Sequence, residues 1–207
     1  MLNISNSRAE FQRLLQARLE HPERRSEIDQ TIHARFDRDC AIFVLDLSGF
    51  SRLTQRCGII HFLEMIYHMT AIASPLIHQQ GGTVIKQEAD NLFALFAQVQ
   101  PAIDAAVDIL KAFSVVNFGL PDDRDLYAEI GIGYGTTLVI GEEDIFGCEV
   151  NLASKLGEDV ARRGEILLTE AAFQQLSAVQ SEQWERLVLT VSEMEMIAYK
   201  FKLAPLL

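Results

Sequence analysis

Two apolar segments, each placing an aspartate where a strand pattern meets a turn, constrain the fold of this chain most. Residues 41–51 (AIFVLDLSGFS) carry Asp46 at the end of a buried strand pattern, and residues 81–96 (GGTVIKQEADNLFALF) carry Asp90 between two strand patterns. If the fold brings these two carboxylates together, they repel each other strongly unless a divalent cation lies between them. The first hypothesis is therefore a site for Mg²⁺ and a nucleotide.

Strand and helix patterns alternate from residue 41 onwards. The expected order is a strand at 41–47, a helix at 60–79, two strands within 83–96, a helix at 101–116 and a strand at 126–133. This β-α-β-β-α-β order predicts an α+β, ferredoxin-like fold in which helices cover an antiparallel sheet. The expected C-terminal additions are a strand at 137–140, a helix at 150–162, a strand at 165–169, a short helix from residue 170, and strands at 186–191 and 195–201.

The first forty residues are more polar than the rest and favour helix. Apolar residues recur at helical spacing on both sides of Pro22, and they are Phe11, Leu14, Leu15 and Leu19 before it and Ile28, Ile32 and Phe36 after it. We predict a helical extension over residues 1–40 and a globular domain over residues 41–207. Two roles stay open for the extension: an arm packed on the domain, or helices that dimerise or transmit a signal.

Composition excludes several classes of protein. The formal net charge is -11 over 207 residues, so no basic stripe is available to neutralise a nucleic-acid backbone, and we expect no nucleic-acid partner. The N-terminus lacks a signal-peptide layout, and no apolar run approaches the ~20 residues that span a bilayer. Three widely spaced cysteines without a C-x-x-C pair favour a reducing compartment. We therefore expect a cytoplasmic protein without a membrane segment.

A third segment, residues 144–155 (DIFGCEVNLASK), allows a family to be suggested. Together with LDLSGF and with GGTVIK followed by Asp90, it resembles the catalytic domain of class III nucleotidyl cyclases, most closely the adenylyl type. The resemblance covers roughly residues 41–203. It implies that the domain converts ATP to 3′,5′-cyclic AMP and pyrophosphate, and that it works as a head-to-tail homodimer with two equivalent sites.

In this resemblance Asp46 and Asp90 take the positions of the two metal-binding aspartates, which would hold two Mg²⁺ or Mn²⁺ ions per site. Ser48, Gly49 and Phe50 follow Asp46, where a glycine lets the backbone approach a phosphate of the substrate. Simpler roles also remain open. Asp46 could cap the following helix, and Asp90 could be a hairpin carboxylate paired with Lys86.

Lys86 and Asp144 match the pair that reads adenine in adenylyl cyclases, whereas guanylyl cyclases typically carry glutamate and cysteine there. A carboxylate accepts a hydrogen bond from the adenine amino group while an ammonium donates to a ring nitrogen, so the pair favours ATP. The open alternative is that both residues are ordinary surface charges.

Asn151 and Lys155 are four residues apart and would project from one face of a helix. In the resemblance Asn151 orients the ribose and Lys155 meets the charge that builds on the phosphates. The family usually has arginine at the second position and glycine at the position of Ala89. Lysine lacks the planar, two-pronged donor geometry of arginine, so we expect reduced rather than absent turnover.

The expected shared site takes its metal aspartates from one protomer and its base-reading and transition-state residues from the other. A glycine-lysine stem that often reaches the terminal phosphates is not recognisable in residues 191–201. Two alternative functions therefore stay open: a guanylyl or purine-promiscuous cyclase, and a low-activity or silent module for nucleotide binding or dimerisation.

Overall fold

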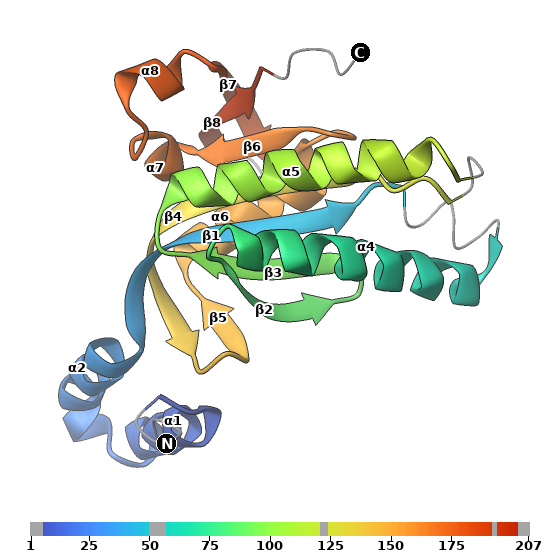
Figure 1. The fold of residues 1–207 in the computed structure, drawn as a ribbon. Coiled ribbons are helices and arrows are strands. Elements are labelled where there is room, and N and C mark those ends of the chain that lie inside the picture. The colour runs from blue at the N-terminus through green and yellow to red at the C-terminus, as the bar shows by residue number, and fades with distance from the viewer. Residues whose placement is uncertain (1–5, 50–56, 121–123, 192–193, 203–207) are drawn as a thin grey trace.

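The computed structural model describes residues 6–49, 57–120, 124–191 and 194–202 (Figure 1). The helices are α1 (Arg8–Glu20), α2 (Arg25–Phe36), α4 (Ile59–Gln79), α5 (Val99–Asn117), α6 (Cys148–Lys155), α7 (Glu170–Phe173) and α8 (Ala178–Ser181), with a 3-10 turn at Pro22–Arg24 and a π-helical turn at Leu156–Val160. The strands are β1 (Asp37–Leu47), β2 (Thr83–Glu88), β3 (Asn91–Phe96), β4 (Ala128–Ile140), β5 (Asp144–Phe146), β6 (Ile166–Thr169), β7 (Trp184–Val191) and β8 (Met194–Phe201).

The strands form one sheet in the order β2-β3-β1-β4-β6-β8-β7, with β5 paired to β4 outside this path. The first four strands of that order are antiparallel neighbours joined through α4 and α5, which is the ferredoxin-like arrangement expected from the sequence. β6 lies parallel to β4, because the chain returns through α6 before it enters β6. The α+β fold is confirmed, and this one parallel pair makes the complete sheet mixed.

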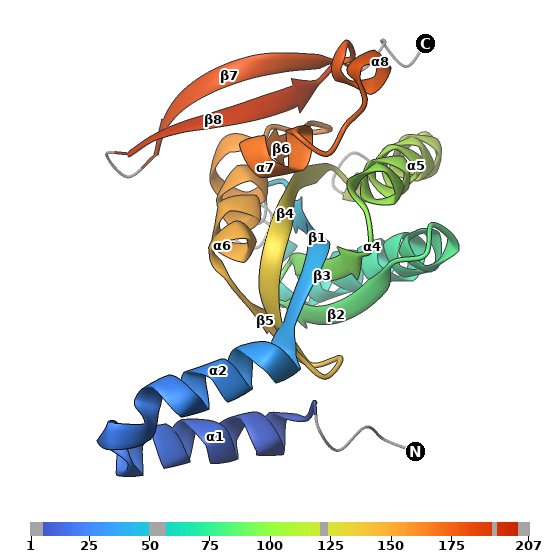
Figure 2. The same ribbon diagram turned by 90° about the vertical axis from the view of Figure 1, so that its left-hand side faces the viewer.

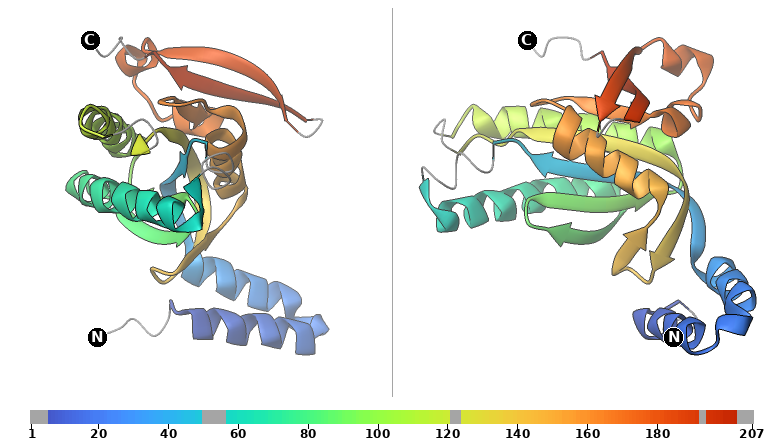
Figure 3. Two further views of the ribbon diagram at one scale, coloured as in Figure 1. Left: turned by 90° about the vertical axis from the view of Figure 1, so that its right-hand side faces the viewer. Right: turned by 180° about the vertical axis from the view of Figure 1, so that it is seen from behind.

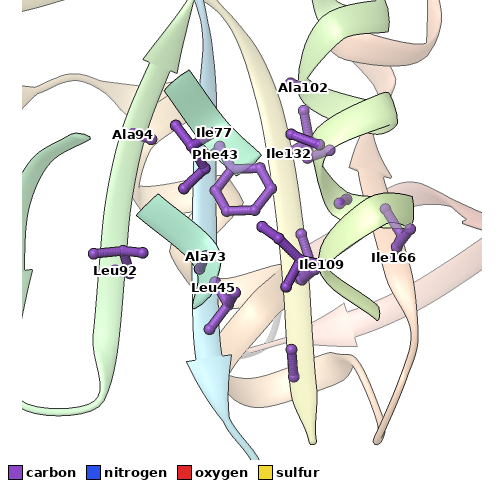
Figure 4. Close-up of a cluster of buried hydrophobic side chains, with 14 of the residues drawn as sticks. Phe43, Leu45, Ala73, Ile77, Leu92, Ala94, Ala102, Ile109, Ile132 and Ile166 are labelled. Carbon is purple, nitrogen blue, oxygen red and sulfur yellow. The ribbon is translucent and has the colours of Figure 1, made fainter. Parts of the chain in front are cut away.

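Helices α4 and α5 cover one face of the sheet, and α6 lies on the opposite face (Figures 1 and 2). Alternate residues of β1, including Phe43 and Leu45, face α4 and α5 and are fully buried. Figure 4 shows these two side chains between Ile77 of α4, Ile109 of α5 and Ile132 of β4. This apolar layer fixes the four central strands on which the candidate site is built.

The opposite face explains the GIGYG sequence of β4. A Cβ atom on Gly131 would lie 2.0 Å from the carbonyl oxygen of Ala153 and 2.7 Å from the backbone nitrogen of Gly157. Only a residue without a side chain therefore lets the backbone of α6 and of the following π-helical turn lie this close to β4. In the right-hand view of Figure 3, which is seen from behind, α6 crosses in front of the central strands.

Helices α1 and α2 form a hairpin at the end of the molecule that carries β5 (Figure 2). Leu14, Ile28, Ile32 and Phe36 of the hairpin are buried together with Ile140 of β4, which confirms the four-residue spacing noted in the second helix. Leu15 and Leu19 are exposed instead, at 40% and 69%. The expected division at residue 40 falls inside β1, because that strand begins at Asp37.

Other boundaries also differ from the expected ones. The strands expected at 126–133 and 137–140 form the single strand β4, and the helix expected at 150–162 divides into α6 and the π-helical turn. β5 was not predicted, since a three-residue strand gives almost no periodic signal. Within the described ranges, no helix combines the length and apolar character needed to cross a bilayer.

Candidate functional site

The two aspartates singled out in the sequence come together at one end of the sheet. Asp46 is the second-last residue of β1, and Asp90 lies in the turn between β2 and β3. Because Leu45 of β1 pairs with Leu92 of β3, the end of β1 coincides with this turn. The two carboxyl groups lie close enough that the charge of Asp90 contributes to the raised pKa of Asp46, and Asp90 is only 8% exposed.

Two further carboxylates surround this pair. Glu129 of β4 is the register partner of Asp46, and Glu158 lies in the π-helical turn. Burial and then the charges of Asp90, Glu129 and Glu158 raise the pKa of Asp46 far above its ordinary value, and burial also raises the pKa of Asp90. We call these four residues the acidic end. Its negative charges are close, partly buried and mutually repulsive, so a bound cation would stabilise their ionised form.

The donor atoms of the acidic end fit a hard divalent cation. Carboxylate oxygens are the ligands that Mg²⁺ and Mn²⁺ prefer, and Mg²⁺ commonly takes one or two carboxylates with substrate phosphates and water completing its shell. The described part of the chain contains no group of three or more His, Cys, Asp or Glu side chains arranged around one ion position. Asp46 and Asp90 thus suit a metal that binds together with an anionic ligand.

The loop after β1 brings a cation to the edge of the acidic end. Ser48 Oγ accepts a hydrogen bond from Arg163 Nε at 3.2 Å, and the Arg163 guanidinium lies 4.8 Å from the centre of the Tyr127 ring. Gly49 has a φ of +89°, a conformation in which a side chain is strained. Phe50 and the helix start expected after it lie outside the described residues.

Arg163 was missed by sequence reasoning. It stands 115 residues after Ser48, and no spacing rule connects the two positions. The contact forms because the turn before β6 lies beside the first residue of β4, where Gly164 N donates a hydrogen bond to Ala128 O at 2.8 Å. Only the folded sheet brings Arg163 to Ser48, so the sequence alone carries no signal for this contact.

The turn that carries Asp90 has a strained backbone. Ala89 has a φ of +51°, which favours glycine, and it is the position where the cyclase family usually has glycine. The turn therefore keeps its left-handed conformation although the residue carries a Cβ atom.

Lys86 of β2 and Asp144, the first residue of β5, also come together. Lys86 Nζ lies 2.9 Å from Asp144 Oδ1, and only 19% and 16% of the two side chains are exposed. Lys86 Nζ also contacts Glu88 at 2.8 Å and lies 4.9 Å from the centre of the Phe93 ring. Burial alone would raise the pKa of Asp144, but hydrogen bonds from Lys86 and Ile145 N lower it overall. We call Lys86 and Asp144 the ion-pair edge.

Asn151 and Lys155 lie on α6, on the face of the sheet away from α4 and α5. Asn151 is exposed and Lys155 is half-buried. Glu149 on the first turn of α6 fixes this helix, because its Oε2 accepts hydrogen bonds from the Thr169 hydroxyl at 2.8 Å and from Tyr134 N at 3.3 Å. One chain thus assembles three groups, which are Asp46 with Asp90, Lys86 with Asp144, and Asn151 with Lys155.

Comparison with known proteins agrees with this arrangement. The sequence pattern described as "Adenylate and Guanylate cyclase catalytic domain" matches residues 32–202. An adenylate cyclase of Streptomyces coelicolor is 31% identical over 141 residues, which are 68% of this chain and 35% of that protein. A putative adenylate cyclase 3 of Rhizobium meliloti is 26% identical over 133 residues, which are 64% of this chain and 22% of that protein. The chain thus spans about a third or less of these relatives' length.

A solved structure shows the same fold. The adenylate/guanylate cyclase/hydrolase from Silicibacter pomeroyi superimposes with a TM-score of 0.69 and 27% identity, covering 80% of this chain and 96% of that one. The family pattern extends over most of the chain, and the fold, the paired aspartates and the helix α6 all lie within it. The chain therefore belongs to the class III adenylate and guanylate cyclase catalytic-domain family.

Proposed function

We propose that this chain is an adenylyl cyclase domain, which forms 3′,5′-cyclic AMP and pyrophosphate from ATP at a site shared by two copies. The observation that carries the choice of ATP is the 2.9 Å contact between Lys86 and Asp144. It joins a donor and an acceptor in one half-buried pair, which suits the amino group and the ring nitrogen of adenine. Guanine presents the opposite pattern and would leave these groups unpaired.

In the proposed reaction the ribose 3′-oxygen forms a bond to the α-phosphorus, pyrophosphate leaves, and the 3′-hydroxyl proton passes to solvent. Asp46 and Asp90 would hold two divalent cations, Mg²⁺ or Mn²⁺, which when bound supply activation of the 3′-hydroxyl and neutralisation of the triphosphate. Ser48 and Gly49 would contact the phosphates, and the absence of a side chain on Gly49 would let the backbone approach them closely. Phe50, the next residue, is proposed to take part in substrate binding as well.

The residues of α6 are proposed to act on the nucleotide held by a partner copy. Asn151 would orient the ribose through its amide, and Lys155 would meet negative charge on the phosphates as the α-phosphorus is attacked. Asn151 is exposed on the sheet face that α4 and α5 leave uncovered, so a second copy can reach it. A head-to-tail homodimer would then form two equivalent sites.

The direct test incubates the purified protein with ATP or GTP and either Mg²⁺ or Mn²⁺ and detects the cyclic product. Cyclic AMP formed in preference to cyclic GMP supports the proposal. Equal turnover of both nucleotides would favour a purine-promiscuous cyclase. Metal-dependent ATP binding without a cyclic product would favour a silent nucleotide-binding module.

The shared site is tested by mixing two inactive variants. Asp46→Ala and Asn151→Ala homodimers should each be nearly inactive, because each lacks one half of both sites. Random exchange of subunits makes about half of the dimers heterodimers with one intact site, so activity should return to about a quarter of the wild-type value. No recovery from two folded variants that exchange subunits would rule out the shared site.

A further inference from the structure

The helical hairpin α1–α2 contacts the ion-pair edge directly. Arg8, the first residue of α1, lies 2.8 Å from Glu143 through Nε and 3.3 Å from Asp144 Oδ2 through a terminal guanidinium nitrogen. Asp144 therefore receives one cation from β2, Lys86, and a second from α1. The hairpin and the proposed base-reading pair are joined by a single carboxylate.

The hydrogen bonds of Asp144 determine which of its oxygens can meet a nucleotide base. Oδ1 accepts a hydrogen bond from Ile145 N at 3.0 Å and lies 2.9 Å from Lys86 Nζ in the ion pair. With these two nitrogens so close, Oδ1 has little room for a further donor. Oδ2 accepts from Arg8 alone among the contacts of the described residues and keeps one position open. A purine amino group would therefore bind the oxygen that Arg8 holds.

Two more contacts attach α1 and a residue before it to the two ends of β5. Asn6 Oδ1 accepts a hydrogen bond from Gly141 N at 2.7 Å, in the turn that leads into β5. At the other end of β5, the Phe11 ring stacks on the Phe146 ring with centroids 6.3 Å apart, and it also meets the Phe36 ring edge-on at 5.2 Å. The hairpin, with Asn6 before it, therefore touches both the turn before β5 and the last residue of this three-residue strand.

We propose that Arg8 is a positioning residue for nucleotide selection. It fixes Oδ2 of Asp144, the oxygen with an open acceptor position, so that docking of the N-terminal hairpin sets the preference for ATP over GTP. This proposal rests on the proposed function, because it takes Asp144 to accept from the adenine amino group. It assigns the hairpin a task at the site that a merely supporting arm would not have. Among the described residues, the ion pairs of Arg8 reach Glu143 and Asp144 and none of the four carboxylates of the acidic end, so it acts on base selection rather than on the phosphates.

The test measures kcat/KM for ATP and for GTP in Arg8→Ala and in the wild type. Exposed ion pairs contribute little, so we expect the ATP-to-GTP ratio of kcat/KM to fall about two- to fivefold. The loss should lie in KM for ATP with kcat nearly unchanged, because Arg8 touches neither ribose nor phosphate. Arg8→Lys keeps the charge but cannot grip Glu143 and Asp144 with one planar group, so it should recover the ratio only in part.

A matched control is available on the same hairpin. Arg24 lies 2.7 Å from Glu27 in an ion pair of the same kind, and both residues are in the part of the hairpin away from β5. Arg24→Ala should leave the ATP-to-GTP ratio unchanged. An unchanged ratio in Arg8→Ala would overturn the proposal. A higher kcat/KM for ATP in Arg8→Ala would overturn it as well, because Arg8 would then compete with adenine for the oxygen.

Binding measurements separate this proposal from the proposed function. Calorimetric titration with 3′-deoxy-ATP and 3′-deoxy-GTP, which cannot cyclise, should show the same loss of discrimination in Kd for Arg8→Ala. If the wild type makes no cyclic nucleotide but Arg8→Ala still shows this loss of discrimination in Kd, the cyclase activity is refuted and the role of Arg8 is supported. A cyclase whose Kd ratio does not change in Arg8→Ala would refute the role of Arg8 alone.

Discussion

The acidic end and the ion-pair edge lie on the same small sheet but have opposite electrostatics. At the acidic end, carboxylates face each other; burial raises the pKa of Asp46 and of Asp90, and like charge raises the pKa of Asp46 further. At the ion-pair edge, a lysine and an aspartate meet at 2.9 Å, and the pKa of Asp144 is lowered. The first region is destabilised until a cation binds, whereas the second is neutralised within the protein.

This difference separates two requirements of one proposed reaction. A site that must gain its metal with each nucleotide benefits from carboxylates that are not already paired, because unpaired charge attracts the cation. A site that must distinguish two purines benefits from donors and acceptors that are already in place, because little orientation is then lost on binding. The same backbone positions both, since Lys86 and Asp90 lie on the strand and the turn of one hairpin.

Removal of one acidic carboxylate should give the largest effect on activity. Asp46→Asn should lower kcat by about 10²-fold or more, because the charge that would hold the cation is lost. The melting temperature of the metal-free protein should rise at the same time, because repulsion with Asp90 is relieved. Activity assays and thermal melts in a chelator measure the two effects. Glu185→Gln, an exposed carboxylate on β7, is the control that should change neither, and a lower melting temperature for Asp46→Asn would break the comparison.

The ion-pair edge should behave in the opposite way. Lys86→Met should lower the free energy of unfolding by about 1 to 3 kcal/mol, because Asp144 loses its main partner while 84% covered. The same variant should lose about 10- to 100-fold of its preference for ATP over GTP, which is the range for a hydrogen bond to a charged group. The matched double variant Lys86→Met with Asp144→Leu should recover stability but not the preference for ATP. Equal stability of Lys86→Met and the wild type would contradict the comparison.

The fold and the residue pairs could be predicted from sequence because their signals are local or repeated. The continuous apolar run of β1, together with the order of the following elements, was enough to predict the ferredoxin-like core. The approach of Asp46 to Asp90 followed from that topology, since both stand where strands of the core end. Four-residue spacing placed Asn151 and Lys155 on one helix.

The remaining features depend on contacts between distant segments. Arg163 reaches Ser48, and Arg8 reaches Asp144, across 115 and 136 residues, and neither position carries a motif. Glu129 joins the acidic end only because its register in β4 sets it opposite Asp46. The glycines of β4 gave a visible pattern, but their cause is the close approach of the backbone of α6, which exists only in the folded chain.

A substitution on α6 can show whether the positive charge of Lys155, which belongs to neither region, limits the reaction. Lys155→Arg should raise kcat up to about tenfold, because a guanidinium can donate two parallel hydrogen bonds to a phosphate where an ammonium acts as a point charge. The steady-state rate with ATP measures the effect, and Lys111→Arg on the exposed face of α5 is the control. An unchanged or lower rate would mean that the lysine already meets the geometric demand of the phosphates.

The last expected effect is a pH dependence of stability that arises at the acidic end. The raised pKa of Asp46 means that the folded, metal-free protein binds a proton more tightly than the unfolded chain, whose aspartate has the ordinary value of 3.8. Its contribution to stability is therefore complete below that value and is lost as the pH rises through the raised pKa.

Melting temperatures of the metal-free protein should be lower at about pH 8 than at about pH 5, and Asp46→Asn should flatten this slope. Asp144→Asn should leave the slope in place, because the lowered pKa of Asp144 affects stability only in more acidic solution. A slope that disappears in Asp144→Asn but persists in Asp46→Asn would reverse the electrostatic roles given to the two regions.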